Sequence, residues 1–433
     1  MFWSSDDQKT GSYAASSDIH PYDEEIEAFF TRNGFDGATR DACDEYARVR
    51  FPGSAAKPAA TQGYCSYTLN ISDEYLLQFR PEAFKLDTDT CMEVKSIYGK
   101  FAPTTRYLGE VGGVALQQVP DANVRSSAMM HVYLHQRIRG IPLSEFRKRN
   151  KSCRPDEDKM FKRRLMSGLA KVFALGFRAR QASQEMKRIL PAGTMAKGTI
   201  GKSMRWRLNL LSGLPDKDLL THVSEAQAQL DIVEASSWCL THGDLLPGNM
   251  MVDAKTGHLT GLIDWAEVEW LPFGMALYGV EEVLGEDMPS AAGGFEYYDD
   301  HEELRQLFWD EFLASVRRDG EEIQLREAEA ARKLGILLWR GIAFDDGKMD
   351  RVVESGRDDS EIHKLRLFLE APSVVVCSNK KCHWSESLIS LWACVRRVFW
   401  HGGRGCCFGS ESDETDLRAR KDTFINRSKL GAA

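Results

Sequence analysis

The sequence predicts an α+β fold in which a small β-rich N-terminal lobe is followed by a larger helical C-terminal lobe. Short runs of aromatic and β-branched residues gather between residues 62 and 138, and such runs favour strands. From about Pro155 onward, apolar residues recur instead at helical spacing over long segments. A chain of 433 residues is also too long for one ordinary core, so two lobes are expected.

The N-lobe is expected over residues 25–136. Residues 1–24 are polar and rich in Ser and Asp, which predicts a disordered N-terminus. The run QGYCSYTLNISDEYLLQFR contains a turn at Asn-Ile-Ser-Asp and predicts a β-hairpin over residues 64–80. Residue spacing and end signals predict helices over EEIEAFFTRNGF, RDACDEYARVRF and DTDTCMEVKSIYGKF. The segments TTRYLGEV and AMMHVYLHQRI have the composition of strands, and RGIPLSEF is expected to be the connection that leaves them.

The helical C-lobe is expected over residues 137–371. Within it, the short apolar run WCLT predicts a strand, and the segments NMMVD and HLTGLIDW flank the turn AKTG of a predicted hairpin. Helices are expected before this unit and after it, as far as about Leu369. Residues 372–433 hold five of the ten cysteines and are expected to form a separate, disordered tail.

The composition narrows the class of protein. The chain carries 56 basic and 64 acidic residues, a formal charge of −8, and has no basic block, so nucleic acid is not an expected partner. The N-terminus lacks the basic start and apolar stretch of a secretory signal. No run approaches the roughly 18 apolar residues that span a bilayer. These absences predict a cytoplasmic location with reduced cysteine thiols.

One segment, LTHGDLLPGNMMVD, has a spacing that indicates chemistry. Asp244 and Asn249 lie five positions apart, as in the kinase catalytic loop, and Asp264 ends a following strand, where kinases bind metal. Phosphoryl transfer needs a carboxylate that orients the acceptor hydroxyl and oxygen ligands for Mg²⁺. Pro247, Gly248 and Asn249 are also turn formers, and Asp264 alone could cap a helix. The joint pattern favours the functional interpretation.

These motifs, together with KSIYGKFAPTTRYLG, RIRGIPL and EWLPFGMALYGVEEVLG, resemble the aminoglycoside phosphotransferase and choline kinase-like group, and within it fungal phosphotransferase-family proteins. The resemblance covers roughly residues 38–345. It implies a bilobal protein-kinase-like fold and a kinase that moves the γ-phosphoryl group of ATP, with Mg²⁺, to a hydroxyl of a small molecule. Amino alcohols, aminoglycoside-like molecules and sugars are the implied acceptors.

The resemblance also implies roles for individual residues of the C-lobe. Asp244 corresponds to the catalytic base, and Asn249 and Asp264 correspond to the Mg²⁺ ligands. His242 corresponds to a structural residue that orients the loop backbone. The acidic residues that follow could attract a cationic acceptor, although a solvated helix face explains them equally simply; they are Glu267, Glu269, Glu281 and Glu282.

In the N-lobe, the resemblance implies a nucleotide site made by three segments. Gly63 and Ser66 belong to the loop that covers the phosphates, although this loop has one glycine rather than three. Arg80 stands where kinases have the ATP lysine, with Glu93 as its expected helix partner. Arg is not equivalent to Lys, and Lys85 and Lys95 are alternatives. Backbone groups near Val132 and Leu134 are expected to meet adenine.

Two alternatives to a small-molecule kinase stay open from the sequence. A pseudokinase-like binding module would keep the fold without turnover, and the sparse glycine loop and the missing strand lysine favour it. The intact set of Asp244, Asn249 and Asp264 opposes it. A protein Ser/Thr kinase is disfavoured because no A-P-E element follows Asp264.

Overall fold

The computed structural model describes residues 23–60, 62–112, 129–180, 200–288, 294–317, 324–345 and 348–372. The expectations for residues 1–22 and for the Cys-rich tail from residue 373 onward lie outside these ranges. The chain divides into two compact units, Met1–Val375 and Val376–Ala433, and every feature below belongs to the first. Helix α1 begins at Asp23, so the last two residues of the segment 1–24 are helical rather than disordered.

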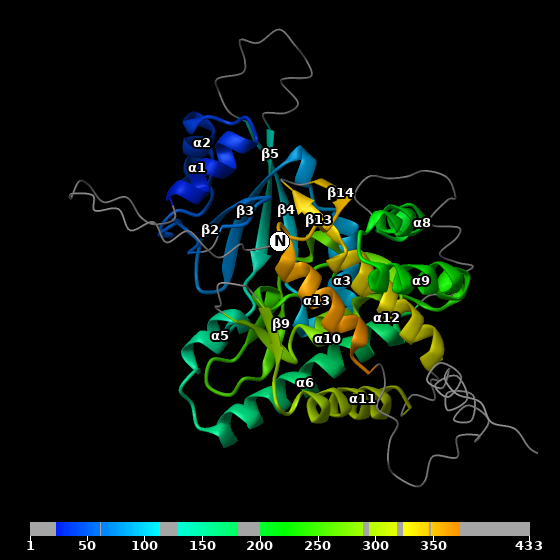
Figure 1. Cartoon of the computed structure of the whole chain (residues 1–433). Helices are drawn as coiled ribbons and strands as arrows, with labels where there is room; N and C mark the ends of the chain where they lie inside the picture. Colours follow the sequence, from blue (N-terminus) through cyan, green and yellow to red (C-terminus); the bar gives the residue numbers. More distant parts are fainter. Residues whose placement is uncertain are drawn as a thin grey trace, which may run out of the picture. The chain divides into compact units, whose positions relative to one another are not determined.

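The N-terminal part is built on a five-stranded antiparallel sheet in the order β1-β2-β3-β5-β4 (Figure 1). The predicted hairpin over residues 64–80 is present as strands β2 and β3, whose register pairs Thr68 with Gln78. Strand β5 lies between β3 and β4, and both of its edges are hydrogen-bonded. The elements of this part are α1 (Asp23–Arg32), α2 (Gly37–Arg50), β1 (Lys57–Pro58), β2 (Tyr67–Asn70), β3 (Tyr75–Pro81), α3 (Thr88–Tyr98), β4 (Thr105–Gly112) and β5 (Met129–Gln136).

The two faces of this sheet differ because side chains alternate along each strand. Leu77, Phe79 and Val132 lie on one face and pack with apolar residues of α1 and α2, such as Phe29 and Phe30, in a small core of their own (Figure 1). The opposite face is polar. Its β3 and β5 residues include Arg80, Gln78, His131 and Tyr133, which face one another in register.

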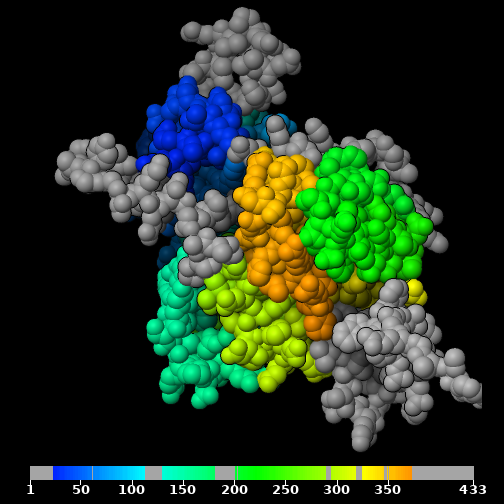
Figure 2. All heavy atoms as spheres, in the orientation of Figure 1, coloured from blue at the N-terminus to red at the C-terminus, as the bar shows by residue number. Residues whose placement is uncertain are grey.

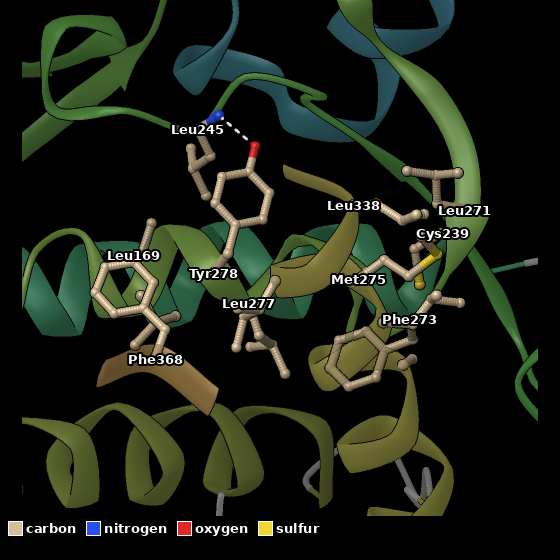
Figure 3. Packing of buried hydrophobic residues seen from close by; sticks show 14 of the residues in the cluster. Leu169, Cys239, Leu245, Leu271, Phe273, Met275, Leu277, Tyr278, Leu338 and Phe368 are labelled. Atoms are coloured by element: carbon tan, nitrogen blue, oxygen red, sulfur yellow. Dashed lines mark hydrogen bonds between the residues drawn. The ribbon is translucent and has the colours of Figure 1, made fainter. Parts of the chain in front are cut away.

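The C-terminal part is mainly helical, so the predicted order of a β-rich part followed by a helical part is confirmed. Helices α6 and α11 pack together, and α12 packs against both α9 and α13 (Figure 1). Their apolar faces share one continuous core that contains Leu169, Tyr278 and Phe368 (Figure 3). The helices are α5 (Leu143–Arg149), α6 (Pro155–Arg178), α8 (Ile200–Leu210), α9 (Lys217–Ala235), α10 (Tyr278–Glu281), α11 (His301–Arg317), α12 (Leu325–Arg340) and α13 (Asp359–Glu370).

The strand and hairpin predicted around the HGD segment are present. Strand β7 pairs antiparallel with β10, and β8 and β9 form a sheet with the short strand β6. The Asn249 turn is a single 3-10 turn directly before β8. The strands of this region are β6 (Ile141–Pro142), β7 (Trp238–Thr241), β8 (Met250–Val252), β9 (Leu259–Leu262) and β10 (Glu269–Pro272).

Several elements of the structure are not predicted by the sequence, among them one helix and two hairpins. Helix α5 begins at Leu143, inside the segment RGIPLSEF that was expected to be a plain connection. Two further hairpins, β11–β12 (Gly285–Met288 with Gly294–Tyr297) and β13–β14 (Ile342–Asp345 with Lys348–Val352), interrupt the later helices. Their strands are short and contain Gly, Asp or Glu, which are depleted in strands. Tertiary pairing therefore decides them.

Part of the surface of the helical region is visible in Figure 2. The β13–β14 hairpin and α13 lie next to α8 and α9 on the face shown, and β14 contacts α8. Among the described helices, none is both long enough and apolar enough to cross a membrane.

Candidate active site

The HGD segment follows β7 through a turn that only glycine accommodates well. Gly243 has φ +81°, and a Cβ atom at this position would lie 2.0 Å from the backbone oxygen of Glu267. L-residues with a side chain are disfavoured at such φ values. The loop backbone therefore approaches the segment after Asp264 closely, because residue 243 has no side chain.

His242 joins the two acidic segments. Its Nε2–H donates to the backbone oxygen of Ile263 (2.7 Å), and its Nδ1 accepts from the backbone N–H of Asp244 (3.3 Å). The side chain is buried, with 3% exposed, and the ring lies 4.6 Å from that of Trp265. Burial lowers the pKa of His242. A neutral imidazole thus connects the backbone at Asp244 to the residue before Asp264.

Asp244 and Asn249 are in direct contact. Asn249 Nδ2 donates to both the backbone oxygen and the Oδ2 atom of Asp244, each at 2.9 Å. Asp244 is 6% exposed. Because the Asn249 amide directs its nitrogen at Asp244, its oxygen atom points elsewhere. The turn of Pro247–Asn249 therefore orients two oxygen-bearing side chains with respect to each other.

Asp264 has an unusual backbone conformation. Its φ of 58° makes it the one non-glycine residue with positive φ among those described. Asp tolerates the left-handed region better than most residues, yet the conformation still costs free energy and is enriched at functional sites. Within the described ranges, the exposed Asp264 carboxylate makes no hydrogen bond or ion pair.

These donors suit a hard cation. The part of the chain that the structure describes contains no group of three or more His, Cys, Asp or Glu side chains that could hold a metal ion. Mg²⁺ needs fewer protein ligands than three, because it keeps several of its water molecules and binds through one or two carboxylates. The exposed carboxylate of Asp264 and the amide oxygen of Asn249 are ligands of the required type.

Two aromatic residues that no sequence pattern singled out hold the backbone of the loop by hydrogen bonds. Tyr278 OH accepts from the backbone N–H of Leu245 (2.9 Å; Figure 3) and donates to the backbone oxygen of Gly243 (3.2 Å). Trp339 Nε1 donates to the same Gly243 oxygen (2.8 Å). The two rings stack, with centroids 4.8 Å apart. They come from α10 and α12, so no local motif could have indicated them.

On the N-lobe side, Arg80 does not pair with Glu93. Arg80 is 3% exposed; its Nε donates to the backbone oxygen of Phe84 (2.6 Å) and its guanidinium to Gln78 Oε1 (3.0 Å). Glu93 is exposed on α3 and forms no ion pair with Arg80 in the described residues. The expected pairing is wrong because η1 (Glu82–Phe84) supplies Arg80 with a nearer acceptor.

The charge of Arg80 nevertheless acts on the acidic segment. Burial raises the pKa of both Cys65 and Glu267; the Asp264 carboxylate adds to this rise, and the charge of Arg80 opposes it. The two alternative lysines are engaged locally: Lys95 donates to the backbone oxygen of Ala102 (2.8 Å), and Lys85 lies 3.9 Å from Glu82. Of the three candidates, Arg80 is the cation whose charge acts to lower the pKa of Glu267, which lies three residues after Asp264.

The expected adenine contact at Val132 and Leu134 is contradicted. Both residues lie in the interior of β5, where the backbone pairs with β3 on one edge and β4 on the other. Their side chains belong to the core under α1 and α2. Neither backbone nor side chain is available to a ligand. The linker after β5, residues 137–140, is the first segment beyond this ladder.

The loop expected to cover the phosphates is a tight turn. Gly63 and Ser66 form an antiparallel bridge at its two ends, and Ser66 is buried. The Tyr64 ring between them lies 3.7 Å from the Arg32 guanidinium carbon and makes an edge contact with Phe344 of the β13–β14 hairpin, with centroids 6.0 Å apart. The turn therefore touches both α1 and the C-terminal part.

Two of the acidic residues considered for a cationic acceptor are used internally, so neither earlier interpretation applies to them. Glu281 and Glu282 are each 2% exposed. Glu281 is paired with Arg305 (2.8 Å), and Glu282 is paired with Arg340 and Lys364. They are neither solvated nor available to a ligand.

The other two acidic residues differ from each other. Glu269 accepts the backbone N–H groups of Ile200 (2.7 Å) and Gly201 (3.1 Å) at the start of α8. Glu267 is exposed. Partial burial of its carboxylate, followed by the negative charges of Asp244 and Asp264, raises its pKa to about 7. A perturbed pKa beside candidate catalytic carboxylates is typical of functional sites.

The comparisons with known proteins identify the family of the chain. A model of the phosphotransferase enzyme family matches residues 81–307, more than half of the chain. The chain belongs to this family, which confirms the resemblance and the prediction of a small-molecule phosphotransferase. No curated protein matches the sequence.

Several solved structures are similar at low identity. Aminoglycoside phosphotransferase APH(3'')-Id from Streptomyces rimosus is 13% identical, with 68% of this chain and 97% of that chain covered and a TM-score of 0.36. The GDP complex of aminoglycoside 2'-phosphotransferase-IIIa is also 13% identical, with 70% and 89% covered and a TM-score of 0.41. TM-scores this low support no substrate or residue role for the present chain.

Proposed function

We propose that this protein transfers the γ-phosphoryl group of ATP to a hydroxyl group of a small molecule, in the presence of Mg²⁺. The observation that supports the proposal is the connection of the Asp244–Asn249 pair to the backbone at Ile263, directly before Asp264, through His242. A site without phosphoryl-transfer chemistry has no need for three oxygen-bearing residues at kinase spacing.

Each residue of the site has its own role in the proposed phosphoryl transfer. Asp244 takes the proton of the acceptor hydroxyl while the acceptor oxygen bonds to the γ-phosphorus and the bond to the ADP oxygen breaks. Asn249 and Asp264 would hold Mg²⁺, which neutralises charge on the phosphates when bound. Arg80 supplies a fixed positive charge on the N-lobe side of Asp264. Tyr278 and Trp339 fix the loop backbone so that Asp244 keeps its orientation.

The acidic residues near the site bear on the charge of the acceptor molecule. Of the four acidic residues considered for a cationic acceptor, three are occupied by arginine, lysine or backbone partners, and Glu267 alone is exposed beside the site. One exposed carboxylate is a weak basis for charge selection. The panel of acceptors should therefore include neutral sugars as well as amino alcohols and aminoglycosides.

The test combines nucleotide binding with turnover in the full chain. Calorimetry would measure ATP binding with and without Mg²⁺, and a coupled assay would measure ADP release with the acceptor panel. Asp244→Asn should keep nucleotide binding and lower turnover by about 10²- to 10⁴-fold, the usual contribution of a positioned general base.

Asp253→Asn is the matched control, because it makes the same chemical change in the β8–β9 turn, where the Asp253 carboxylate accepts hydrogen bonds from the backbone N–H groups of Lys255 and Thr256 and from the Thr256 hydroxyl. Its turnover should equal that of the wild type. Turnover that survives in Asp244→Asn would contradict the mechanism. Absence of ATP binding to the wild type would contradict the proposed kinase activity and would favour the alternative of a pseudokinase-like binding module.

A further inference from the structure

A second concave surface lies on the helical part and shares no residue with the candidate active site. It has a volume of about 880 Å³, and α6 forms one long side of it. Residues of the turn after α3, of β9 and of α11 complete the lining. We refer to this surface as the α6 groove.

The α6 groove is positively charged in a protein whose formal charge is −8. Five basic side chains line it, against two acidic ones. The basic residues are Lys100, Lys159, Arg163, Arg164 and Lys171, and the acidic residues are Asp156 and Glu311. Local concentration of one sign of charge attracts ligands of the opposite sign.

Three of these cations form no ion pair within the described residues, although Lys100 Nζ lies 5.1 Å from the centroid of the adjacent Phe101 ring. Lys159 is paired with Glu303 (2.9 Å), and Arg164 donates to a backbone oxygen in the β8–β9 turn (2.9 Å). Lys100, Arg163 and Lys171, by contrast, are exposed and form no ion pair with any described residue. Their charges are therefore available to a partner.

The spacing of the cations on α6 defines the shape of what they would bind. Lys159, Arg163 and Lys171 recur four and eight residues apart, so they lie on one stripe of the helix, an i, i+4 row that turns by about 120° around it from Lys159 to Lys171. With a rise of about 1.5 Å per residue, the stripe is roughly 18 Å long. Lys100 reaches the groove from the turn after α3.

The floor of the α6 groove is apolar. Phe101 and Leu259 are buried beneath it, and Leu307 of α11 is half-buried. Gly168 brings α6 close to β9: a Cβ atom there would lie 2.7 Å from the Cβ atom of Leu259. A bound molecule would meet an apolar base between cationic rims.

We propose that the α6 groove docks an extended acidic peptide segment of a partner protein, with an apolar side chain set on the floor. Small-molecule sites enclose most of their ligand, whereas Lys159, Arg163 and Lys171 are exposed along some 18 Å of helix, with Lys159 paired to Glu303. An extended chain of about six residues spans that length at about 3.3 Å per residue. Charge complementarity and the length of the stripe together favour this occupant over a compact anion.

The test uses the full-length protein and fluorescence anisotropy. The probe is a fluorescein-labelled peptide of Glu, Leu and Gly, and its matched control carries Gln in place of every Glu. The acidic peptide should bind, and should bind more weakly at high salt. The Gln peptide should bind at least about tenfold more weakly, since it cannot pair with the cations.

Protein variants locate the site. The double variant Arg163→Glu, Lys171→Glu should lose about tenfold or more in affinity for the acidic peptide. Lys217→Glu is the control: Lys217 is exposed at the start of α9, outside the groove, and the change has the same chemistry. It should bind within about twofold of the wild type. Thermal unfolding should be unchanged in both variants, because all the altered residues are exposed.

Three results would overturn the proposal. The first is absence of acidic-peptide binding by the wild type. The second is equal affinity in the double variant and the wild type. The third is binding of inorganic tripolyphosphate through Arg163 and Lys171 without binding of the peptide, which would define a small-anion site instead.

Discussion

Replacement of Tyr278 by Phe isolates the contribution of one hydroxyl group to the catalytic loop. The Tyr278 side chain is fully buried, and its ring would keep its stacking on Trp339. The hydroxyl accepts from the N–H of Leu245 (2.9 Å; Figure 3) and donates to the oxygen of Gly243 (3.2 Å). The Gly243 oxygen retains the bond from Trp339 Nε1, so the main loss is at Leu245.

The magnitude follows from this asymmetry. A buried donor left without an acceptor costs about 1–3 kcal/mol, whereas an acceptor that keeps one of its two bonds costs less. We therefore expect Tyr278→Phe to lower the free energy of unfolding by about 2 kcal/mol. Turnover should fall as well, because Leu245 adjoins Asp244 and the loop loses one of its two supports.

Urea unfolding measures this change as a lower midpoint at constant slope. Tyr298→Phe is the control, because the Tyr298 hydroxyl forms no hydrogen bond within the described residues; its stability should stay within about 0.5 kcal/mol of the wild type. A Tyr278→Phe variant as stable as Tyr298→Phe would refute the assigned role of the hydroxyl.

Three further predictions concern the same region and its surroundings. Gly243→Ala should destabilise the protein by at least about 2 kcal/mol and abolish turnover, because φ is +81° and the new Cβ would collide with Glu267; an unchanged melting temperature would contradict this. Burial lowers the pKa of His242, so the unfolded state binds more protons below about pH 6.5 and stability should fall as the pH drops through that range. His242→Gln should reduce this pH dependence of stability. Parallel curves of unfolding free energy against pH for the variant and the wild type would exclude His242 as its source. Arg305→Met should cost about 3 kcal/mol in denaturant unfolding because it removes the nearest cation from buried Glu281; a loss below about 1 kcal/mol would show that other partners suffice.

The local sequence determined the parts of the fold that depend on neighbouring residues. The run WCLT becomes β7, and the turn residues of AKTG join β8 to β9, because an apolar run and a turn each carry their own preference. The spacing of Asp244, Asn249 and Asp264 likewise predicted that they would lie near one loop and one hairpin, since few residues separate them.

Only the tertiary structure decided which distant groups meet. Strand β5 lies between β3 and β4, and this order, which no local pattern encodes, removes Val132 and Leu134 from any ligand. Arg80 meets a nearby carbonyl rather than the helix glutamate, because η1 follows β3 directly.

The tertiary structure also decided which basic residues pair with Glu281 and Glu282. Glu281 and Glu282 were candidates for an acceptor site until α11, α12 and α13 brought basic side chains to them. The support of the HGD loop by Tyr278 and Trp339 has the same origin. Spacing along the chain indicates which residue types are available, but pairing is fixed by packing between elements far apart in sequence, where burial requires every charge and polar group to find a partner.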